Sequence, residues 1–304
     1  MIPEPSDWWL GVALACLAAL GFAGQFLFVR LGTVEGDVND AVFIALACNV
    51  VLLAPPVVIL YPPPYTQLFT PTSALAFAAA GLIGMFAARI LLFTSVGKIG
   101  ANLTAPIISS NVLFATVIAV VALGERLSPQ HALGILLVVV GVAVVSWETA
   151  DAGPDRSLRD TGAMLTLPLG AAIFIGIEPT LISVGLGDGT PVLPGILLMA
   201  MTASIAFLCY LFVVEGGPSL PDSSRSTGWF VAAGVSTTVG FVGYFAGLSL
   251  APVVLVVPLI QLAPLIVVVV SLIALPRHLE RITWQVGFAA VVVVVGATLV
   301  SLSG

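Results

Sequence analysis

Long apolar segments, separated by short polar ones, fill almost the whole chain of 304 residues. A run of roughly 20 apolar residues is long enough to cross a hydrocarbon core of ~30 Å as an α-helix. The pattern predicts ten such helices, which cover residues 8–31, 40–60, 72–97, 101–122, 130–147, 161–186, 191–214, 227–250, 252–275 and 283–302. We therefore expect an all-α integral membrane protein with ten transmembrane helices.

A polar turn that leads into a valine-rich helix occurs twice, near the middle and near the end of the chain. The acids of the two turns, Glu125 and Glu280, lie 155 positions apart. Earlier in each half the spacing is slightly shorter, because Pro106 and Pro258 lie 152 positions apart. These nearly constant spacings predict that the chain is an internal duplication.

The duplication divides the chain into a first repeat of residues 1–147, a polar linker of residues 148–160 and a second repeat of residues 161–304. Each repeat holds five of the predicted helices. After an odd number of crossings, the second repeat enters the membrane from the face opposite the first. The two repeats are therefore expected to form a pair of inverted topology, with a solute site between them at the bilayer midplane.

Both polar turns have the features of a helix start. Ser128 and Thr283 can accept backbone N–H bonds as N-caps of the helices that follow. Glu125 and Glu280 then lie beside positive helix N-termini. We expect a structural role for both turns, with a direct role in transport as the alternative.

Composition excludes several classes of protein. Only 8% of the residues are charged, against about 25% in soluble domains, and the mean hydropathy is +1.19. The net charge is −6, which excludes a basic nucleic-acid surface. Cys16, Cys48 and Cys209 lie in predicted helices without the spacing of a metal or redox site. We therefore expect no metal, no cofactor and no enzymatic activity, because no nucleophile–base pair is apparent either.

The two turns and their flanking helices carry a family resemblance. Residues 101–106, the turn at 124–128, Gly134 and Gly141 resemble the EamA-type half of the drug/metabolite transporter (DMT) superfamily. Residues 248–296 resemble a second copy, although Leu-Pro-Arg-His-Leu stands at 275–279, where a Gly-Glu turn is usual. The resemblance covers essentially the whole chain. It implies a ten-helix carrier in the cell membrane that works by alternating access and exports small metabolites such as amino acids.

The orientation in the membrane receives two conflicting predictions. The resemblance implies that both termini are cytoplasmic. The loops that this orientation places outside contain most of the basic residues, namely Arg30, Lys98, Arg156, Arg159, Arg225, Arg277 and Arg281. The positive-inside rule favours the opposite orientation.

Two ionisable residues lie well inside predicted helices, and they are the strongest candidates for a site. Placing a charge at a helix centre costs ~2.5–3.5 kcal/mol on insertion scales, so such residues normally line a cavity or serve function. Arg89 offers a planar cation for a carboxylate or phosphate group. Glu178, directly before Pro179, could take up and release a proton and couple transport to a proton gradient.

An ion pair between these two residues is the structural alternative. Helix arithmetic places Arg89 and Glu178 ~12 Å apart in depth at 1.5 Å per residue, which weighs against a simple direct pair. The question stays open at this stage.

Neutral residues complete the predicted substrate site. They are Ser109 and Ser110 on the helix at 101–122, Gln261 on the helix at 252–275, Thr237, Phe241 and Tyr244 on the helix at 227–250, and Gln25 on the first helix. Gln261 follows Ser109 by 152 positions, and Phe241 follows Arg89 by the same number. For each of them, an interhelical hydrogen bond worth ~0.6 kcal/mol is the structural alternative.

The pattern favours a secondary transporter for small organic solutes, in which two five-helix halves rock about a central cavity. Its expected partners are a small-molecule solute and the lipid bilayer, and the oligomeric state is left open. A carrier for phosphorylated solutes or nucleotide sugars, or for cations, is the alternative within the same fold. One intramembrane arginine is little for a phosphate site, and one carboxylate is little for a cation site. A non-transporting scaffold is the alternative of another class.

Overall fold

The computed structural model describes residues 5–99, 104, 107–149, 162–214, 216–217, 223–274 and 284–302. These residues form helices joined by turns, and no strand occurs among them. The first half contains α1 (Pro5–Gly32), α2 (Val38–Leu60), η1 (Tyr65–Leu68), α3 (Pro71–Ala80), η2 (Gly81–Ala87), α4 (Ala88–Ile99), α6 (Asn111–Ile118), η3 (Ala119–Leu123) and α7 (Pro129–Thr149). The second half contains η4 (Gly162–Leu165), α8 (Thr166–Gly187), α9 (Val192–Val214), α10 (Ser224–Leu250), α11 (Val253–Ile260), α12 (Ala263–Ala274) and α13 (Trp284–Leu302).

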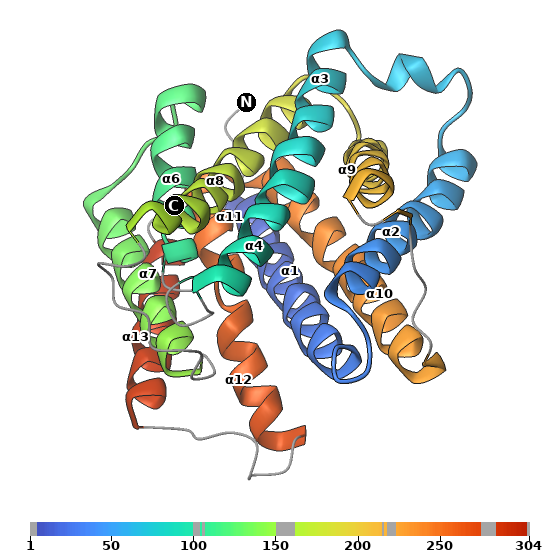
Figure 1. Ribbon diagram of the computed structural model, residues 1–304. Helices are drawn as coiled ribbons and strands as arrows, with labels where there is room; N and C mark the ends of the chain where they lie inside the picture. Colours follow the sequence, from blue (N-terminus) through green and yellow to red (C-terminus); the bar gives the residue numbers. More distant parts are fainter. Residues whose placement is uncertain are drawn as a thin grey trace.

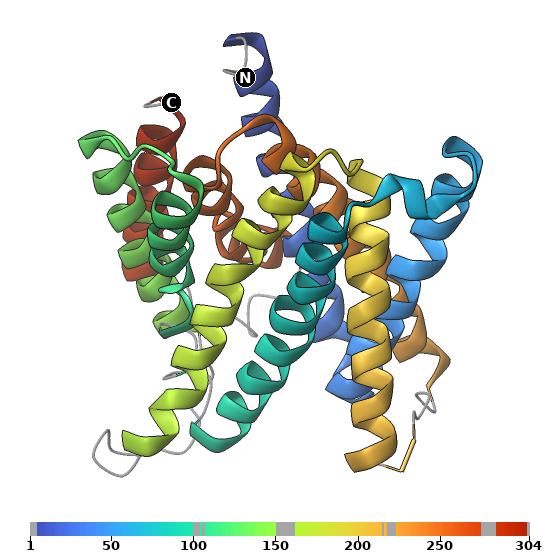
Figure 2. The ribbon, with the colours of Figure 1, turned by 90° about the horizontal axis from the view of Figure 1, so that it is seen from above.

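The predicted class, an all-α membrane protein, is confirmed. Six helices in the described residues are long and apolar enough to cross a membrane: 8–32, 38–60, 71–95, 166–187, 192–214 and 224–250. Four shorter apolar helices, at 111–123, 129–144, 253–267 and 287–302, lie at the other predicted positions. The start of α1 and the end of α13 lie on the same side of the bundle (Figure 2). The count of ten crossings stays a prediction.

Helices from the two halves interleave. α1 packs along α10, and α8 packs against the rod formed by α3, η2 and α4 (Figure 1). α2 lies against α9 and α10, and α7 pairs with α13. The two halves therefore do not form separate bodies, and the expected rocking of one whole half against the other does not match this packing.

Close approach between α7 and α13 depends on small residues. A Cβ placed on Gly134 would lie 2.7 Å from the carbonyl oxygen of Gly296, and a Cβ on Gly296 would lie 2.7 Å from that of Gly134. A Cβ on Gly141 would lie 3.0 Å from the carbonyl oxygen of Ala289. Positions 134 and 289, like 141 and 296, are 155 apart, so the two contacts are related by the repeat.

Small residues also allow close approach between α1 and α10. Gly243 and Gly247 of α10 form a G-x-x-x-G motif: a Cβ on Gly243 would lie 2.9 Å from the Leu14 carbonyl oxygen, and one on Gly247 would lie 3.5 Å from that of Gly11. Apolar side chains are surrounded equally well by lipid tails and by protein, so close backbone packing is a main source of helix association in a membrane.

Matching hydrogen bonds tie the ends of these cross-half helix pairs. The hydroxyl of Ser223, the N-cap of α10, donates to Oε2 of Glu35 at 2.8 Å, just after α1. The hydroxyl of Thr70, the N-cap of α3, donates to Oδ2 of Asp188, just after α8. Thr70 and Ser223 lie 153 positions apart, and so do Glu35 and Asp188. The repeat therefore places one such hydrogen bond at each of two equivalent helix ends.

Two predicted helices are interrupted in the structure. The segment predicted at 101–122 turns at Ser109 and Ser110 before α6, and the segment predicted at 252–275 turns at Gln261 and Leu262 between α11 and α12. In the second case Pro258 lacks the N–H that a continuous helix requires. The two turns lie 152 positions apart, which the repeat predicts.

Substitution of Gly296 by alanine tests the packing of α7 against α13. We expect Gly296→Ala to destabilise the protein by about 1–3 kcal/mol, because the added methyl group meets backbone rather than a flexible side chain. Gly287→Ala on the same helix is the control, since a Cβ there has nothing within 4 Å. The measurement is thermal unfolding in detergent, and equal unfolding temperatures for the two variants would contradict the packing account.

Candidate functional site

Glu178 lies in α8, next to the π-helical turn η2 of the first half. A Cβ built on Gly84 in that turn would overlap Oε2 of Glu178 and would lie 2.6 Å from its Cδ. Glu178 is partly buried, and its carboxylate makes no hydrogen bond to the residues that the structure describes. The carboxylate therefore lies between α8 and the rod of α3, η2 and α4.

Arg89 lies in the first turn of α4, directly after η2. It is partly buried and is electrostatically attracted to Glu178. Within the described part of the chain, no ion pair or hydrogen bond joins the two side chains. The structure thus brings the two predicted charges into one region without a direct ion pair between them.

Aromatic side chains of α1 and α10 lie beside this charged region. Tyr244 is buried and lies within electrostatic range of Glu178. The ring of Phe22 makes edge contacts with Phe241 and Tyr244, at centroid distances of 5.3 and 6.3 Å. Phe245 makes a further edge contact with Tyr244 at 6.2 Å. Two predicted residues, Phe241 and Tyr244, therefore belong to one aromatic cluster that also contains Phe22 and Phe245.

The two predicted glutamines lie at or near the interrupted helices. Gln25 of α1 is buried, and Gln261 lies in the turn between α11 and α12. Neither side chain makes a hydrogen bond to another residue that the structure describes. α1 reaches the same turn, because Ala23 packs in one cluster with Ala263.

The predicted hydroxyl residues are engaged locally. Ser110 donates to the carbonyl oxygen of Ile107 at 2.6 Å, and Thr237 donates to that of Ala233 at 2.8 Å. Ser109 is buried and also has an interaction partner. Ser110 and Thr237 thus donate within their own helices, and each hydroxyl oxygen keeps only its acceptor lone pairs for any further partner.

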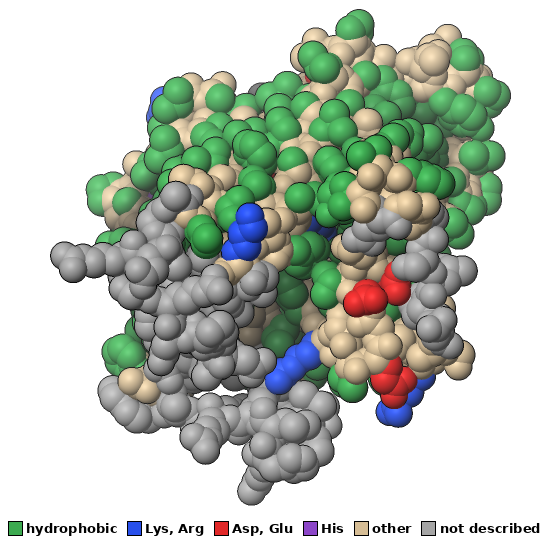
Figure 3. Space-filling model, in the orientation of Figure 1, with side chains coloured by type: hydrophobic (Ala, Val, Ile, Leu, Met, Phe, Trp, Pro, Cys, Tyr) green, Lys and Arg blue, Asp and Glu red, His purple; other side chains and the backbone are tan. Residues whose placement is uncertain are grey.

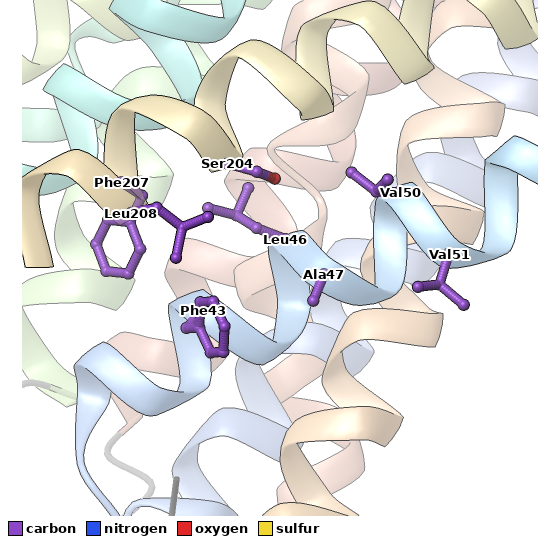
Figure 4. Close-up of a pocket in the computed structure, with 8 residues that line it drawn as sticks. All are labelled: Phe43, Leu46, Ala47, Val50, Val51, Ser204, Phe207 and Leu208. Carbon is purple, nitrogen blue, oxygen red and sulfur yellow. The ribbon is translucent and has the colours of Figure 1, made fainter. Parts of the chain in front are cut away.

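The surface offers two hollows of different character. Figure 3 shows one face hollowed near its centre, over the region of α1 and α4 in Figure 1, with Lys or Arg side chains around the hollow. A separate groove of about 290 Å³ lies between α2 and α9 and is lined by Phe43, Leu46, Ala47, Val50, Val51, Ser204, Phe207 and Leu208 (Figure 4). The Ser204 hydroxyl donates to Ala200, so the groove is apolar. None of the predicted site residues lines it.

Glu125 caps a helix of the other half. Its Oε1 accepts the backbone N–H of Val253 at 2.8 Å, and its Oε2 accepts that of Val254 at 2.9 Å, at the start of α11. Burial raises the pKa of Glu125, and the two N–H bonds partly reverse this effect. The sequence placed Glu125 at the start of α7, which is corrected here.

The helix α7 has its own cap. The backbone N–H of His131 donates to the hydroxyl of Ser128 at 3.1 Å, which confirms the predicted N-cap. Because Ser128 satisfies α7, the Glu125 carboxylate is free to reach α11. The matching predictions for Glu280 and Thr283 lie outside the described residues.

We expect Glu125→Ala to destabilise the protein by about 1–2 kcal/mol, because two N–H groups at the start of α11 lose their acceptor. Asp37→Ala is the control, since Asp37 stands at the N-cap of α2 but makes no capping bond and is exposed. Thermal unfolding of both variants in detergent measures the effect. A Glu125→Ala protein as stable as the control would show that water or another group replaces the cap.

The sequence analysis missed Gly84, Phe22 and Phe245 as neighbours of the charged region. The repeat spacing does not indicate a role for Gly84. Its neighbour Glu178 has no acidic counterpart in the first repeat, where the equivalent position is Phe26. The described residues contain no group of three or more His, Cys, Asp and Glu side chains that could hold a metal ion.

Comparison with known proteins gives a family and a fold. The model of the EamA-like transporter family matches twice, at residues 9–147 and 162–302. No curated protein matches the chain in sequence. A solved structure titled "Crystal structure of protein" is similar with a TM-score of 0.74 and 18% sequence identity, over 94% of this chain and 96% of that one. At this identity the similarity indicates a shared fold alone.

Proposed function

Because the chain belongs to the EamA-like transporter family of the DMT superfamily, it is a multi-pass membrane transporter, and we propose that it is a secondary carrier that exports small organic solutes by alternating access. Amino acids and related zwitterions are the proposed substrates. The cell membrane is the proposed location, with cytoplasmic termini as in the family.

The observation that carries this proposal is the separation of two attracting charges that do not touch. A zwitterionic solute can bind between them, with its carboxylate on Arg89 and its ammonium group on Glu178. Tyr244 and Phe241 can pack against an apolar part of the same solute. The amides of Gln25 and Gln261 supply neutral donors and acceptors at the edge of this region.

The interrupted helices also support a solute path. Non-helical backbone within a membrane is tolerated only where it is buried in protein or lines a cavity. Discontinuous helices in equivalent positions of two repeats are typical of carrier binding sites. Since helices of the two halves interleave, the proposed moving units are cross-half pairs such as α1 with α10 and α8 with α3–α4.

Proton coupling through Glu178 is the second element of the proposal. A carboxyl group that faces the solute can carry a proton in one direction and release it before the solute binds. Export of the solute would then be driven by inward proton flow.

We expect Glu178→Gln to remove the acceleration of solute flux by a pH gradient, because the amide cannot titrate. The measurement is flux in proteoliposomes with and without the gradient, for a panel of amino acids, organic cations and sugar phosphates. Asp37→Asn, at an exposed loop position, is the control and should retain the acceleration. Gradient-driven flux that persists in Glu178→Gln would disprove the coupling, and a folded protein that moves no solute of the panel would favour a scaffold.

We expect Arg89→Gln to raise KM for solutes with a carboxylate by about 10- to 150-fold, the equivalent of about 1.5–3 kcal/mol for a lost charge-assisted bond. An amine that lacks the carboxylate should show little change. Arg126→Gln, in the exposed turn after η3, is the matched control. An equal rise of KM for the amine and the carboxylate would show that Arg89 acts on the fold rather than on the solute.

The orientation can be tested separately. A single cysteine placed in the linker at 148–160, in a variant without the three native cysteines, should react with a membrane-impermeant reagent from outside if the termini are cytoplasmic. Reaction only from inside would support the charge bias instead.

A further inference from the structure

We propose that Gly84 is a positioning residue for Glu178: its missing side chain leaves the space in which the Glu178 carboxylate lies, and so fixes where this carboxylate meets the solute. The inference rests on the proposed function of Glu178. It goes further by assigning a role to a residue that carries no functional group.

The contact involves the whole end of the Glu178 side chain. A Cβ on Gly84 would overlap Oε2 and would lie 2.6 Å from Cδ and 2.7 Å from Cγ. Gly84 itself is buried in η2. A methyl group at position 84 therefore cannot be accommodated by rotating the carboxylate alone, and the side chain must leave its place.

The backbone of η2 places this glycine. η2 is a π-helical turn of seven residues inside an otherwise α-helical rod, a local widening that is frequent at functional sites. Gly81, also in η2, faces α9, where a Cβ would lie 2.9 Å from Oγ1 of Thr202, whereas Gly84 faces α8. Arg89 follows the turn directly, so one stretch of backbone sets the place of both predicted charges.

The second repeat provides an internal comparison. The position equivalent to Gly84, 152 residues later, is Ser236 of α10. Its hydroxyl donates to the carbonyl oxygen of Gly21 at 2.9 Å, across the equivalent helix pair. The fold thus accepts a side chain at this position when the facing helix leaves room. In the first repeat the room is filled by Glu178, which indicates that Gly84 serves the carboxylate rather than the packing of the repeat.

Within the described residues, the other titratable or charged groups coupled to this carboxylate are Arg89 from α4 and Tyr244 from α10. Displacing the Glu178 carboxylate changes its distance to both. A displacement of about 1 Å in a reacting or binding group can lower rates by about 100-fold. Gly84→Ala should therefore alter transport without any change in the chemical groups of the site.

The test measures solute flux of Gly84→Ala in proteoliposomes as a function of pH. We expect the flux to fall by at least about tenfold at neutral pH and the midpoint of the pH profile to move. Gly187→Ala is the matched control, because Gly187 lies in the same helix as Glu178 and a Cβ there has nothing within 4 Å. An unchanged pH profile and flux in Gly84→Ala would overturn the proposal.

A thermal-stability cycle with Glu178→Ala covers the case in which Gly84→Ala is unstable and gives a readout without transport. If Gly84 holds space for the carboxylate, Gly84→Ala lowers the unfolding temperature of the wild type but has little effect in the Glu178→Ala background. Gly81→Ala, which meets α9 instead, should have the same effect in both backgrounds. An equal effect of Gly84→Ala in both backgrounds would assign Gly84 to general packing and overturn the inference.

The two proposals fail in different ways. If Glu178→Gln retains full gradient-driven flux, the proposed coupling is wrong, whatever the stability cycle gives. If Glu178→Gln abolishes the coupling but Gly84→Ala keeps the wild-type pH profile, the coupling stands and the positioning role of Gly84 is wrong.

Discussion

The backbone of this protein must satisfy its own hydrogen bonds inside a medium that offers none, and the rest of the structure follows from that constraint. An interrupted helix in a membrane exposes N–H and C=O groups at both sides of the break, so protein groups must reach it. At its start, α11 receives its acceptors from Glu125 of the first half, and the short helices beside the breaks are packed between helices of both halves. Interleaving of the two repeats thus lets one half supply hydrogen-bond acceptors to a helix of the other half.

Hydrophobic pattern predicted the helical segments well, because a helix in lipid is defined by its length and apolar character. Prolines in the sequence do not by themselves predict the interruptions at Ser109–Ser110 and Gln261–Leu262, since a proline can kink a helix or break it, depending on what surrounds it. Capping was predicted where it is local, as with Ser128. The partner of Glu125 could not be predicted, because 128 residues separate it from Val253 and the local rules for helix starts pointed to α7.

The charged members of the candidate site could also be identified from the sequence pattern. A charge inside an apolar helix stands out, so Arg89 and Glu178 are evident without a structure. Gly84 does not stand out among the 30 glycines of the chain. Its significance lies in an absent side chain, which only the position of a neighbouring helix can reveal. The repeats are alike in backbone but different in chemistry, with Phe241 and Ser236 at the positions of Arg89 and Gly84.

The two equivalent hydrogen bonds at the helix ends bear on which side of the proposed carrier opens more easily. Ser223 with Glu35 and Thr70 with Asp188 are the same kind of contact, a cap hydroxyl on a carboxylate, at equivalent positions of inverted repeats. In the proposed alternating-access cycle, these two contacts by themselves would favour the opening of neither end over the other. In the proposed carrier, the direction of net flow would then be set by Arg89 and Glu178, which have no charged counterparts in the other repeat, together with the gradients across the membrane.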